Sequence, residues 1–291
     1  MRLTRRAVLL ALPALAAASA RAEAPLPVVA TFSILGDFVR EVGGEAVEIS
    51  VIVGPDGDAH VYEPTPADSK KLQRAKLVFV NGLGFEGWLD RLIAASKTKA
   101  RIVVASEGVA ARKLEGEPDP HAWQDVANAR RYVENIRDAL KAADPVRADV
   151  FERRAGAYLQ RLDALDAEVR ASIARIPEAR RRVVSTHDAF GYFAARYGIA
   201  FIAPEGVSTE AEASARDIAR IVDAAKREKV GAVFLENVVD PRLARAIAAD
   251  SGVRLGGELY SDALSPPGGP AADYIAMMRH NVEELSSALV P

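Results

Sequence analysis

The chain of 291 residues contains no cysteine and only four histidines. Without cysteine, the chain as given can hold no disulfide, no thiolate-bound metal and no lipid-modified cysteine. After its first residues it also lacks any apolar run of about 20 residues, the length that a membrane-spanning helix requires. These absences favour a globular protein that depends on its hydrophobic core, for which a chain of this length is sufficient.

The first 22 residues have the pattern of a cleavable export signal. Three arginines lie within the first six residues, residues 7–18 are apolar, and Ala20-Arg21-Ala22 fits a small-x-small cleavage site. Residues 4–9 also resemble a twin-arginine signal, so both the Sec and the twin-arginine routes stay open. An uncleaved membrane anchor is the alternative. We expect a free protein in the periplasm of a Gram-negative bacterium.

Acidic side chains outnumber basic ones once this predicted signal is set aside. Four of the 38 basic residues and none of the 40 acidic residues lie in the signal, so residues 23–291 carry a net charge of −6. A nucleic-acid-binding protein would be expected to show an excess of basic residues. We therefore expect no nucleic-acid partner.

Short apolar runs alternate with helical patterns in both halves of the chain. Predicted strands lie at residues 28–32, 47–53, 77–80, 101–105, 182–185, 200–202, 232–235 and 254–255. Predicted helices lie at residues 34–42, 66–74, 85–96, 189–197, 214–228, 241–251 and 271–289. This alternation is typical of parallel sheets with helices on both faces. Both halves share the rhythm, although no exact sequence repeat is present.

The middle of the chain shows only a helical pattern. Its apolar residues are three or four positions apart, at Phe151, Ala155, Tyr158, Leu162, Leu165, Val169, Ile173 and Ile176. A helix over 146–176 would be about 46 Å long, so we expect a rigid connector that runs along both domains. The alternative is the contact stripe of a coiled-coil dimer.

The predicted fold class is therefore α/β, with two lobes joined by a long helix. The expected divisions are a signal peptide at 1–22, an N-terminal α/β lobe at 23–125, a helical connector at 126–177 and a C-terminal α/β lobe at 178–291.

Three of the four histidines lie in loops that follow predicted strands. His60 follows the strand at 47–53, His121 lies beyond the strand at 101–105, and His187 follows the strand at 182–185. In open α/β sheets, ligands bind beyond the carboxyl ends of the strands. A zinc finger or a helical His-Glu-x-x-His motif would place its ligands much closer together in sequence. The spacing therefore predicts a buried metal site between substructures.

A divalent ion held by three neutral imidazoles still lacks a ligand and negative charge. Asp262, which follows the predicted strand at 254–255, is the best candidate because zinc accepts carboxylate oxygen beside imidazole nitrogen. The runners-up, each near a strand end, are Glu205, Glu210 and Glu236. Three further acids are better placed to orient ligands or cap helices: Glu63, Asp119 and Asp188. His280, on the last predicted helix, is interpreted as a structural or surface residue.

Five segments carry a resemblance to a known family: residues 58–66, 81–88, 119–123, 187–193 and 260–262. Together they resemble the zinc/manganese solute-binding proteins of bacterial ABC importers, the metal-binding cluster A-I family. The resemblance covers nearly the whole chain after residue 22. It implies a fold of two α/β lobes of parallel sheet flanked by helices and joined by one long rigid helix. It also implies that His60, His121, His187 and Asp262 bind the metal.

The chain departs from the family pattern in two places. Ala59 replaces the proline that usually precedes the first histidine, and residues 112–117 replace the long His- and acid-rich loop of many zinc members. Manganese members often have glutamate at the third histidine position. His187 therefore favours zinc, because imidazole suits zinc whereas carboxylate oxygen suits manganese.

The leading interpretation is a periplasmic receptor that binds Zn²⁺ with high affinity and delivers it to an ABC permease in the inner membrane. Mn²⁺ or Fe²⁺ is the alternative ion. Two other classes are a zinc-dependent hydrolase, with Glu205 or Glu210 as base, and a surface adhesin. We expect a monomer without enzymatic activity, and a metallochaperone is a further candidate partner.

Overall fold

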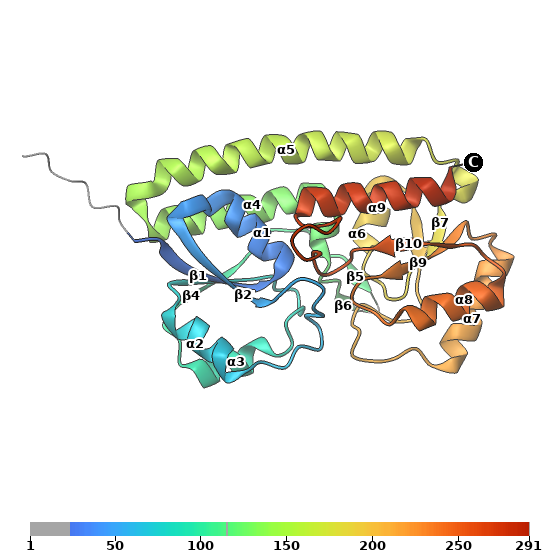
Figure 1. Cartoon of the computed structure of the whole chain (residues 1–291), viewed down its shortest axis with the longest axis horizontal. Helices are drawn as coiled ribbons and strands as arrows, with labels where there is room; N and C mark the ends of the chain where they lie inside the picture. Colours follow the sequence, from blue (N-terminus) through green and yellow to red (C-terminus); the bar gives the residue numbers. More distant parts are fainter. Residues whose placement is uncertain (1–23, 115, 291) are drawn as a thin grey trace, which may run out of the picture.

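Two four-stranded parallel sheets lie side by side beneath a layer of long helices (Figure 1). The computed structural model describes residues 24–114 and 116–290. The predicted signal at 1–22 therefore lies outside the described residues. Among the helices of the described ranges, none combines the length and the apolar character that crossing a membrane requires.

The first sheet is built from apolar strands of the N-terminal half. Its strands are β1 (Leu26–Phe32), β2 (Val47–Val53), β3 (Leu77–Val80) and β4 (Arg101–Val104). They pair in parallel in the order β2-β1-β3-β4. The connecting helices are α1 (Ser33–Gly43), α2 (Pro66–Arg74) and α3 (Leu89–Ser96). All of β3 is buried, as expected for a strand covered on both faces.

The second sheet repeats the topology of the first. Its strands are β7 (Arg182–Val184), β8 (Ala200–Ile202), β9 (Ala232–Glu236) and β10 (Leu255–Leu259). They pair in parallel in the order β10-β9-β7-β8. The helices between them are α6 (Gly191–Tyr197), α7 (Ala215–Arg227) and α8 (Pro241–Ser251). In both halves the second strand lies at one edge of the sheet, and the first, third and fourth strands follow it in that order. The alternation of strands and helices that both halves share therefore corresponds to one repeated topology.

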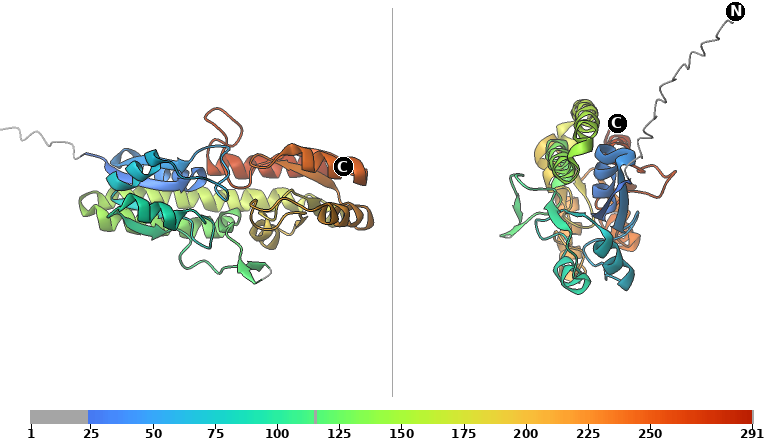
Figure 2. Two further views of the ribbon diagram at one scale, coloured as in Figure 1. Left: turned by 90° about the horizontal axis from the view of Figure 1, so that it is seen from below. Right: turned by 90° about the vertical axis from the view of Figure 1, so that its left-hand side faces the viewer.

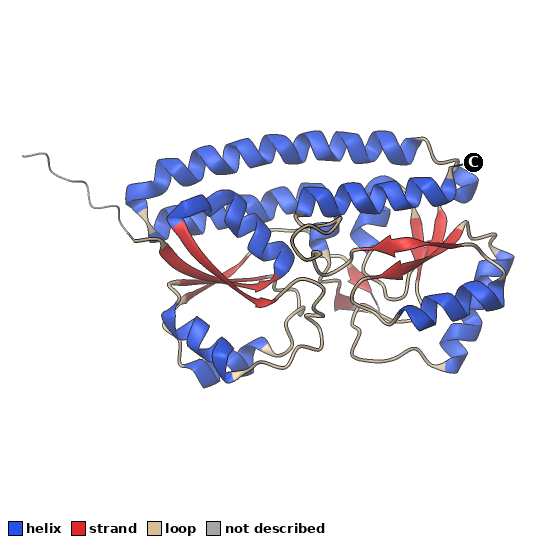
Figure 3. Ribbon diagram, in the orientation of Figure 1, coloured by secondary structure: helices blue, strands red, loops and turns tan. Residues whose placement is uncertain are grey.

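Three long helices form a layer that connects the two sheets (Figures 1 and 3). They are α4 (Val126–Ala143), α5 (Ala148–Ala174) and α9 (Tyr274–Leu289). The 27 residues of α5 span about 40 Å. This helix contacts α1 and α4 on one side and α6 and α9 on the other, so it bridges both halves. The fold prediction of two α/β units joined by a long helix is correct in this respect.

The apolar stripe of α5 is buried within the chain itself. Phe151, Leu162 and Leu165 are fully buried and belong to the same hydrophobic cluster as the neighbouring helices. The coiled-coil alternative is therefore wrong, because the stripe has no free face for a second chain. The helix is also slightly shorter than predicted, because Pro145–Arg147 form a separate 3-10 turn.

The helix predicted from residue 85 begins only at Leu89. Residues 81–88 fold instead around the buried carboxylate of Glu86, which accepts hydrogen bonds from the backbone N–H groups of Asn81 and Gly82. The hydroxyl of Thr31, on β1, donates a further hydrogen bond to the same carboxylate at 2.7 Å. A long-range polar contact thus overrides the local helical pattern.

Several short elements were not predicted from the sequence, and one strand was predicted too short. A two-residue antiparallel hairpin, β5 (Lys113–Leu114) with β6 (Glu117–Pro118), projects from the side of the molecule (Figure 2). The strand expected at 254–255 continues to Leu259. Neither two-residue strand is long enough to produce a recognisable alternation.

We expect Leu162→Ala to lower the free energy of unfolding by about 2–5 kcal/mol, because it leaves a cavity in the core. Leu162 is fully buried at the middle of α5. Denaturant unfolding followed by circular dichroism measures the change. Gln160→Ala, on the exposed side of the same helix, is the matched control and should change the value by less than about 0.5 kcal/mol. Equal stabilities of the two variants would contradict the assignment of this stripe to the core.

Candidate metal centre

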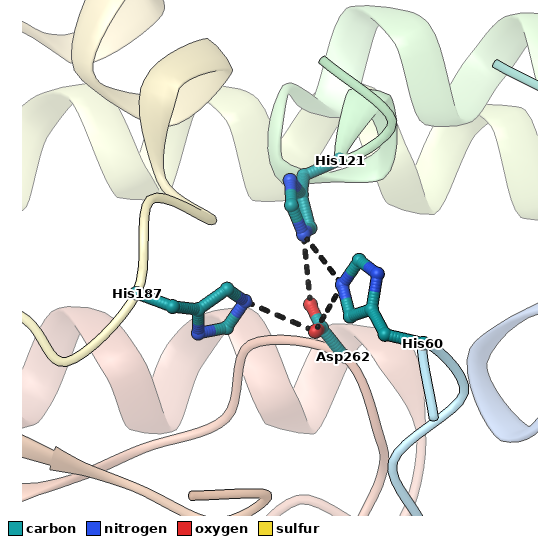
Figure 4. A group of neighbouring side chains, drawn as sticks. All are labelled: His60, His121, His187 and Asp262. Carbon is teal, nitrogen blue, oxygen red and sulfur yellow. Dashed lines mark hydrogen bonds and ion pairs between the residues drawn. The ribbon is translucent and has the colours of Figure 1, made fainter. Parts of the chain in front are cut away.

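Four side chains meet where the two halves of the molecule adjoin: His60, His121, His187 and Asp262 (Figure 4). Each offers one ligand atom, these atoms lie within 4.8 Å of one another, and all four residues are buried. His60 and His121 come from loops of the first half, whereas His187 follows β7 and Asp262 follows β10 in the second. The structure thus brings together the four residues that the sequence analysis selected.

The carboxylate of Asp262 lies among the three imidazoles. Its Oδ2 is 3.2 Å from His60 Nε2 and 3.1 Å from His187 Nε2, and its Oδ1 is 3.5 Å from His121 Nε2. The Nε2 atoms of His60 and His121 are 3.3 Å apart. In a tetrahedral zinc site with bonds of about 2.0–2.1 Å, neighbouring ligand atoms lie about 3.3 Å apart. These separations therefore suit ligands that share one divalent cation.

One carboxylate oxygen of the cluster also has unused bonding capacity. Asp262 Oδ1 is buried, and in the described part of the chain its ion-pair contact with His121 Nε2, at 3.5 Å, is too long for a good hydrogen bond. A buried carboxylate oxygen without a donor is costly unless a cation satisfies it. The donor set and this free oxygen therefore fit a metal ion.

Carboxylates behind two of the imidazoles fix the orientation of their rings. Asp119 Oδ1 lies 2.9 Å from His121 Nδ1 and accepts a hydrogen bond from the backbone N–H of His121. Glu236 Oε2 lies 2.7 Å from His187 Nδ1. Partners of this kind direct the opposite nitrogen toward a metal and raise its basicity. Both Nε2 atoms consequently face Asp262.

Glu236 is itself held in place by the loop that carries His187. Its Oε1 accepts hydrogen bonds from the backbone N–H groups of Thr186 and His187 and from the Thr186 hydroxyl. The carboxylate is thus occupied in orienting the ring, and it lies outside the cluster of four ligand atoms. This geometry does not support Glu236 as the alternative fourth ligand.

The remaining acids and the fourth histidine lie outside the cluster. Glu63 and Glu210 are exposed, and Glu205 is half-buried. The capping role considered for Asp188 is wrong, because α6 begins at Gly191 with Phe190 at its N-cap position. His280 Nε2 lies 2.9 Å from the Glu258 carbonyl oxygen, a structural contact between α9 and β10.

The charges of the cluster shift the pKa values of its members in opposite directions. Burial alone would raise the pKa of Asp262, but the charges of His121 and His187 hold it well below its ordinary value. Burial alone would lower the pKa of His187, but the charges of Glu236 and Asp262 raise it well above its ordinary value. The pKa of His121 is also raised, because Asp262 and Asp119 outweigh the effect of burial. In the absence of a bound cation, protons on these imidazoles therefore compensate the negative charge of the carboxylates.

Two aromatic side chains near the site received no role in the sequence analysis. The ring of Phe85 packs edge-on against His60, with centroids 4.7 Å apart. Trp123 Nε1 donates a hydrogen bond to the carbonyl oxygen of Ser261, directly before Asp262. Both residues lie in the segments that carried the family resemblance, which is the only sequence signal that pointed to them.

With this geometry established, the chain can be compared with known proteins. The family model for the periplasmic component A of the zinc-uptake complex matches residues 28–288. The chain belongs to this family. Together with relatives that are substrate-binding lipoproteins of metal ABC transporters, this makes it a metal-binding, substrate-binding protein of an ABC importer, which acts outside the cytoplasm with a membrane permease, and not an enzyme.

Relatives within this family are named for different metals. The manganese-binding lipoprotein MntA of Halalkalibacterium halodurans is 38% identical over 266 residues, which cover 91% of this chain and 88% of that protein. The iron-binding protein YfeA of Yersinia pestis is 32% identical over 264 residues, 89% and 85% of the two chains. The periplasmic zinc-binding protein TroA of Treponema pallidum has a similar structure, with a TM-score of 0.88 and 33% identity over 92% of this chain and 100% of that one. The predicted fold is thereby confirmed.

We expect Glu236→Gln to weaken metal binding by about 10–100-fold, because it removes the charge that orients His187 and supports its basicity. Isothermal titration calorimetry with a divalent ion measures the change. Glu205→Gln removes a carboxylate from a nearby half-buried position outside the cluster and serves as the matched control. If both variants bind the ion as the unaltered protein does, Glu236 has no orienting role.

Proposed function

We propose that this protein captures Zn²⁺ at His60, His121, His187 and Asp262 and delivers it to the permease of an ABC importer. The donor set carries the proposal, because three imidazole nitrogens and one carboxylate oxygen are typical of four-coordinate zinc. Manganese would be favoured by a larger share of carboxylate ligands. The relatives named for manganese and iron make Mn²⁺ and Fe²⁺ the competing ions.

The charge of the site supports the capture of an ion. Asp262 supplies one negative charge to the ligand shell, and Asp119 and Glu236 place two more behind the imidazoles. All four ligand positions of a tetrahedral ion would be filled by protein atoms. A hydrolytic zinc site instead keeps one position open for water. The arrangement therefore supports binding over the hydrolase alternative.

We also propose that the two lobes, at residues 23–125 and 178–291, close on the ion as separate bodies. Each lobe contributes two of the proposed ligands, so a bound ion would stabilise the closed arrangement over an open one. The connector at 126–177 contains α4 and α5, whose packing against helices of both lobes should limit the amplitude of this motion. In this proposal the protein acts as a monomer after removal of its signal, with a metallochaperone as a candidate donor of the ion.

Thermal melts in metal buffers test the ligand set and the ion together. At free Zn²⁺ 1,000 times above the dissociation constant, binding to the native state should add about 4 kcal/mol of stability. At equal free concentration the gain should be smaller for Mn²⁺, following the usual order of affinities. Asp262→Ala should reduce the zinc gain, because it removes the charged ligand.

The matched control for this experiment is the histidine outside the cluster. His121→Ala should lose most of the zinc-dependent stabilisation, whereas His280→Ala should keep it. A larger gain with Mn²⁺ than with Zn²⁺ would overturn the zinc assignment. An unchanged zinc gain in Asp262→Ala would remove that residue from the ligand set.

Metal affinity should increase with pH up to and through the raised pKa values of His121 and His187, because an imidazole must lose its proton before it can bind a metal. Asp262 should stay ionised throughout, because its pKa is lowered. Zinc binding at pH 7 should therefore release protons. Calorimetry in buffers of different ionisation enthalpy measures the number released. Binding at pH 7 without proton release would show that these imidazoles are already neutral.

A further inference from the structure

The three imidazoles of the cluster are not supported equally. A carboxylate lies behind Nδ1 of His121 and of His187. In the described ranges, no hydrogen bond or ion pair joins Nδ1 of His60 to another group, and its ring instead contacts the edge of Phe85. The position of the His60 ring therefore depends on apolar packing and on the backbone of its own loop.

A cavity of about 450 Å³ opens beside His60. It is lined by Phe85 and Pro120 from the first half and by Val207 and Ser208 from the second. Of the four residues in the cluster, His60 alone lines this cavity within the described part of the chain. An ion that moves between the cluster and this cavity would therefore pass the least supported imidazole.

The segment 205–209 of the second half borders the same cavity and is attached at both of its ends. Near His187, Glu205 N–H donates to the Thr186 carbonyl oxygen at 3.3 Å, and Gly206 accepts from Asp188 N–H at 3.0 Å. At its other end, the Thr209 hydroxyl donates to Asp58 Oδ2 at 2.6 Å. The segment thus connects the loop of His187 to the loop of His60.

Asp58 transmits this contact to His60. While Oδ2 accepts from Thr209, Oδ1 accepts from the backbone N–H of His60 at 2.8 Å. Hydrogen bonds to an ionised carboxylate are stronger than those between neutral groups. The hydroxyl of Thr209, in the second half, therefore helps to fix the backbone position of a proposed ligand in the first half.

We propose that Thr209 is a positioning residue for the retention of the ion, and that the ion leaves past His60 into this cavity once the bond between Thr209 and Asp58 opens. The proposal rests on the proposed function of the cluster. Among the described residues, the hydroxyl of Thr209 bonds to Asp58 and to none of the four ligand side chains, so its removal should leave their donor atoms intact. The base of the His60 loop keeps a separate attachment to the second half, because Asp56 N–H donates to the Leu264 carbonyl oxygen at 2.9 Å.

The test is the dissociation rate of Zn²⁺, measured by stopped-flow mixing of the zinc-loaded protein with an excess of a chelator. Thr209→Val keeps the shape of the side chain and removes the hydroxyl. We expect it to accelerate dissociation by about tenfold or more, the effect of losing one hydrogen bond to a charged group. The association rate should change by less than about threefold, because the bond matters only after the lobes have closed around the ion.

Two further variants separate the bond from a general loss of structure. Thr209→Ser restores a hydroxyl and should return the dissociation rate to within about twofold of the unaltered protein. Thr98→Val, in the first half, also removes a hydroxyl that makes a tertiary hydrogen bond, to the Leu72 carbonyl oxygen, and should leave the rate unchanged. If Thr209→Ser dissociates as fast as Thr209→Val, the hydrogen bond is not the cause.

The outcomes distinguish this inference from the proposed function. A Thr209→Val variant that releases Zn²⁺ at the unaltered rate, while His60→Ala fails to bind it, would overturn the role of Thr209 and leave the metal site in place. If His60→Ala binds and releases Zn²⁺ as the unaltered protein does, both the ligand set and the exit past His60 are wrong. Melting curves of the metal-free variants verify that each is folded.

Discussion

The junction of the two halves depends on one buried charge, the carboxylate of Asp262. This residue is fully buried, and an ionised carboxylate in such a position costs several kcal/mol unless positive charge surrounds it. His121 and His187, with raised pKa values, supply that charge as protons, and a divalent ion would supply it as a metal. Because His121 belongs to the first half, whereas His187 and Asp262 belong to the second, the full compensating charge is present only when both halves are.

The backbone around Asp262 shows the same dependence on both halves. The Ser261 carbonyl oxygen accepts hydrogen bonds from the side chains of Trp123 and Gln124, and Leu264 N–H donates to the hydroxyl of Ser33. The segment that carries Asp262 follows β10 in the second sheet, yet its polar contacts on both sides reach the first half. The carboxylate of Asp262 is thereby anchored to both halves of the molecule.

Much of the fold could be predicted because its signals are local. Helix α2 was placed to the residue, and its start has a proline at Pro66 and a capping box between Thr65 and Asp68. The end of β10 could not be found this way, since Gly256-Gly257 is typical of a loop. In the folded chain the first of these glycines is favoured by packing, because the buried ring of Phe234 occupies the space that a Cβ at Gly256 would fill. The reason for Gly256 thus lies in tertiary packing, which a single sequence does not display.

For the candidate site, too, some residues could be predicted from local sequence signals and others could not. The three histidines could be selected because each follows a strand, and the carboxyl ends of parallel strands meet at one edge of a sheet. The partner of His187 could not be selected, because it depends on strand order. Glu236 ends β9, and β9 pairs directly with β7, whose following loop carries His187. With that strand pairing known, Glu236 would be predicted to orient the ring of His187 and not to bind the metal.

These contacts leave the supports of the cluster unequal in a way that suits a carrier. A protein that only stored an ion would gain from a carboxylate behind every imidazole, since each such partner strengthens binding. Here two imidazoles have that support, and the segment of Asp262 is anchored to both halves. His60 lies where the support is weakest and where the cavity begins. The well-supported ligands, His121, His187 and Asp262, allow the ion to be bound tightly. Release need not be equally slow, because the imidazole of His60 can move away first.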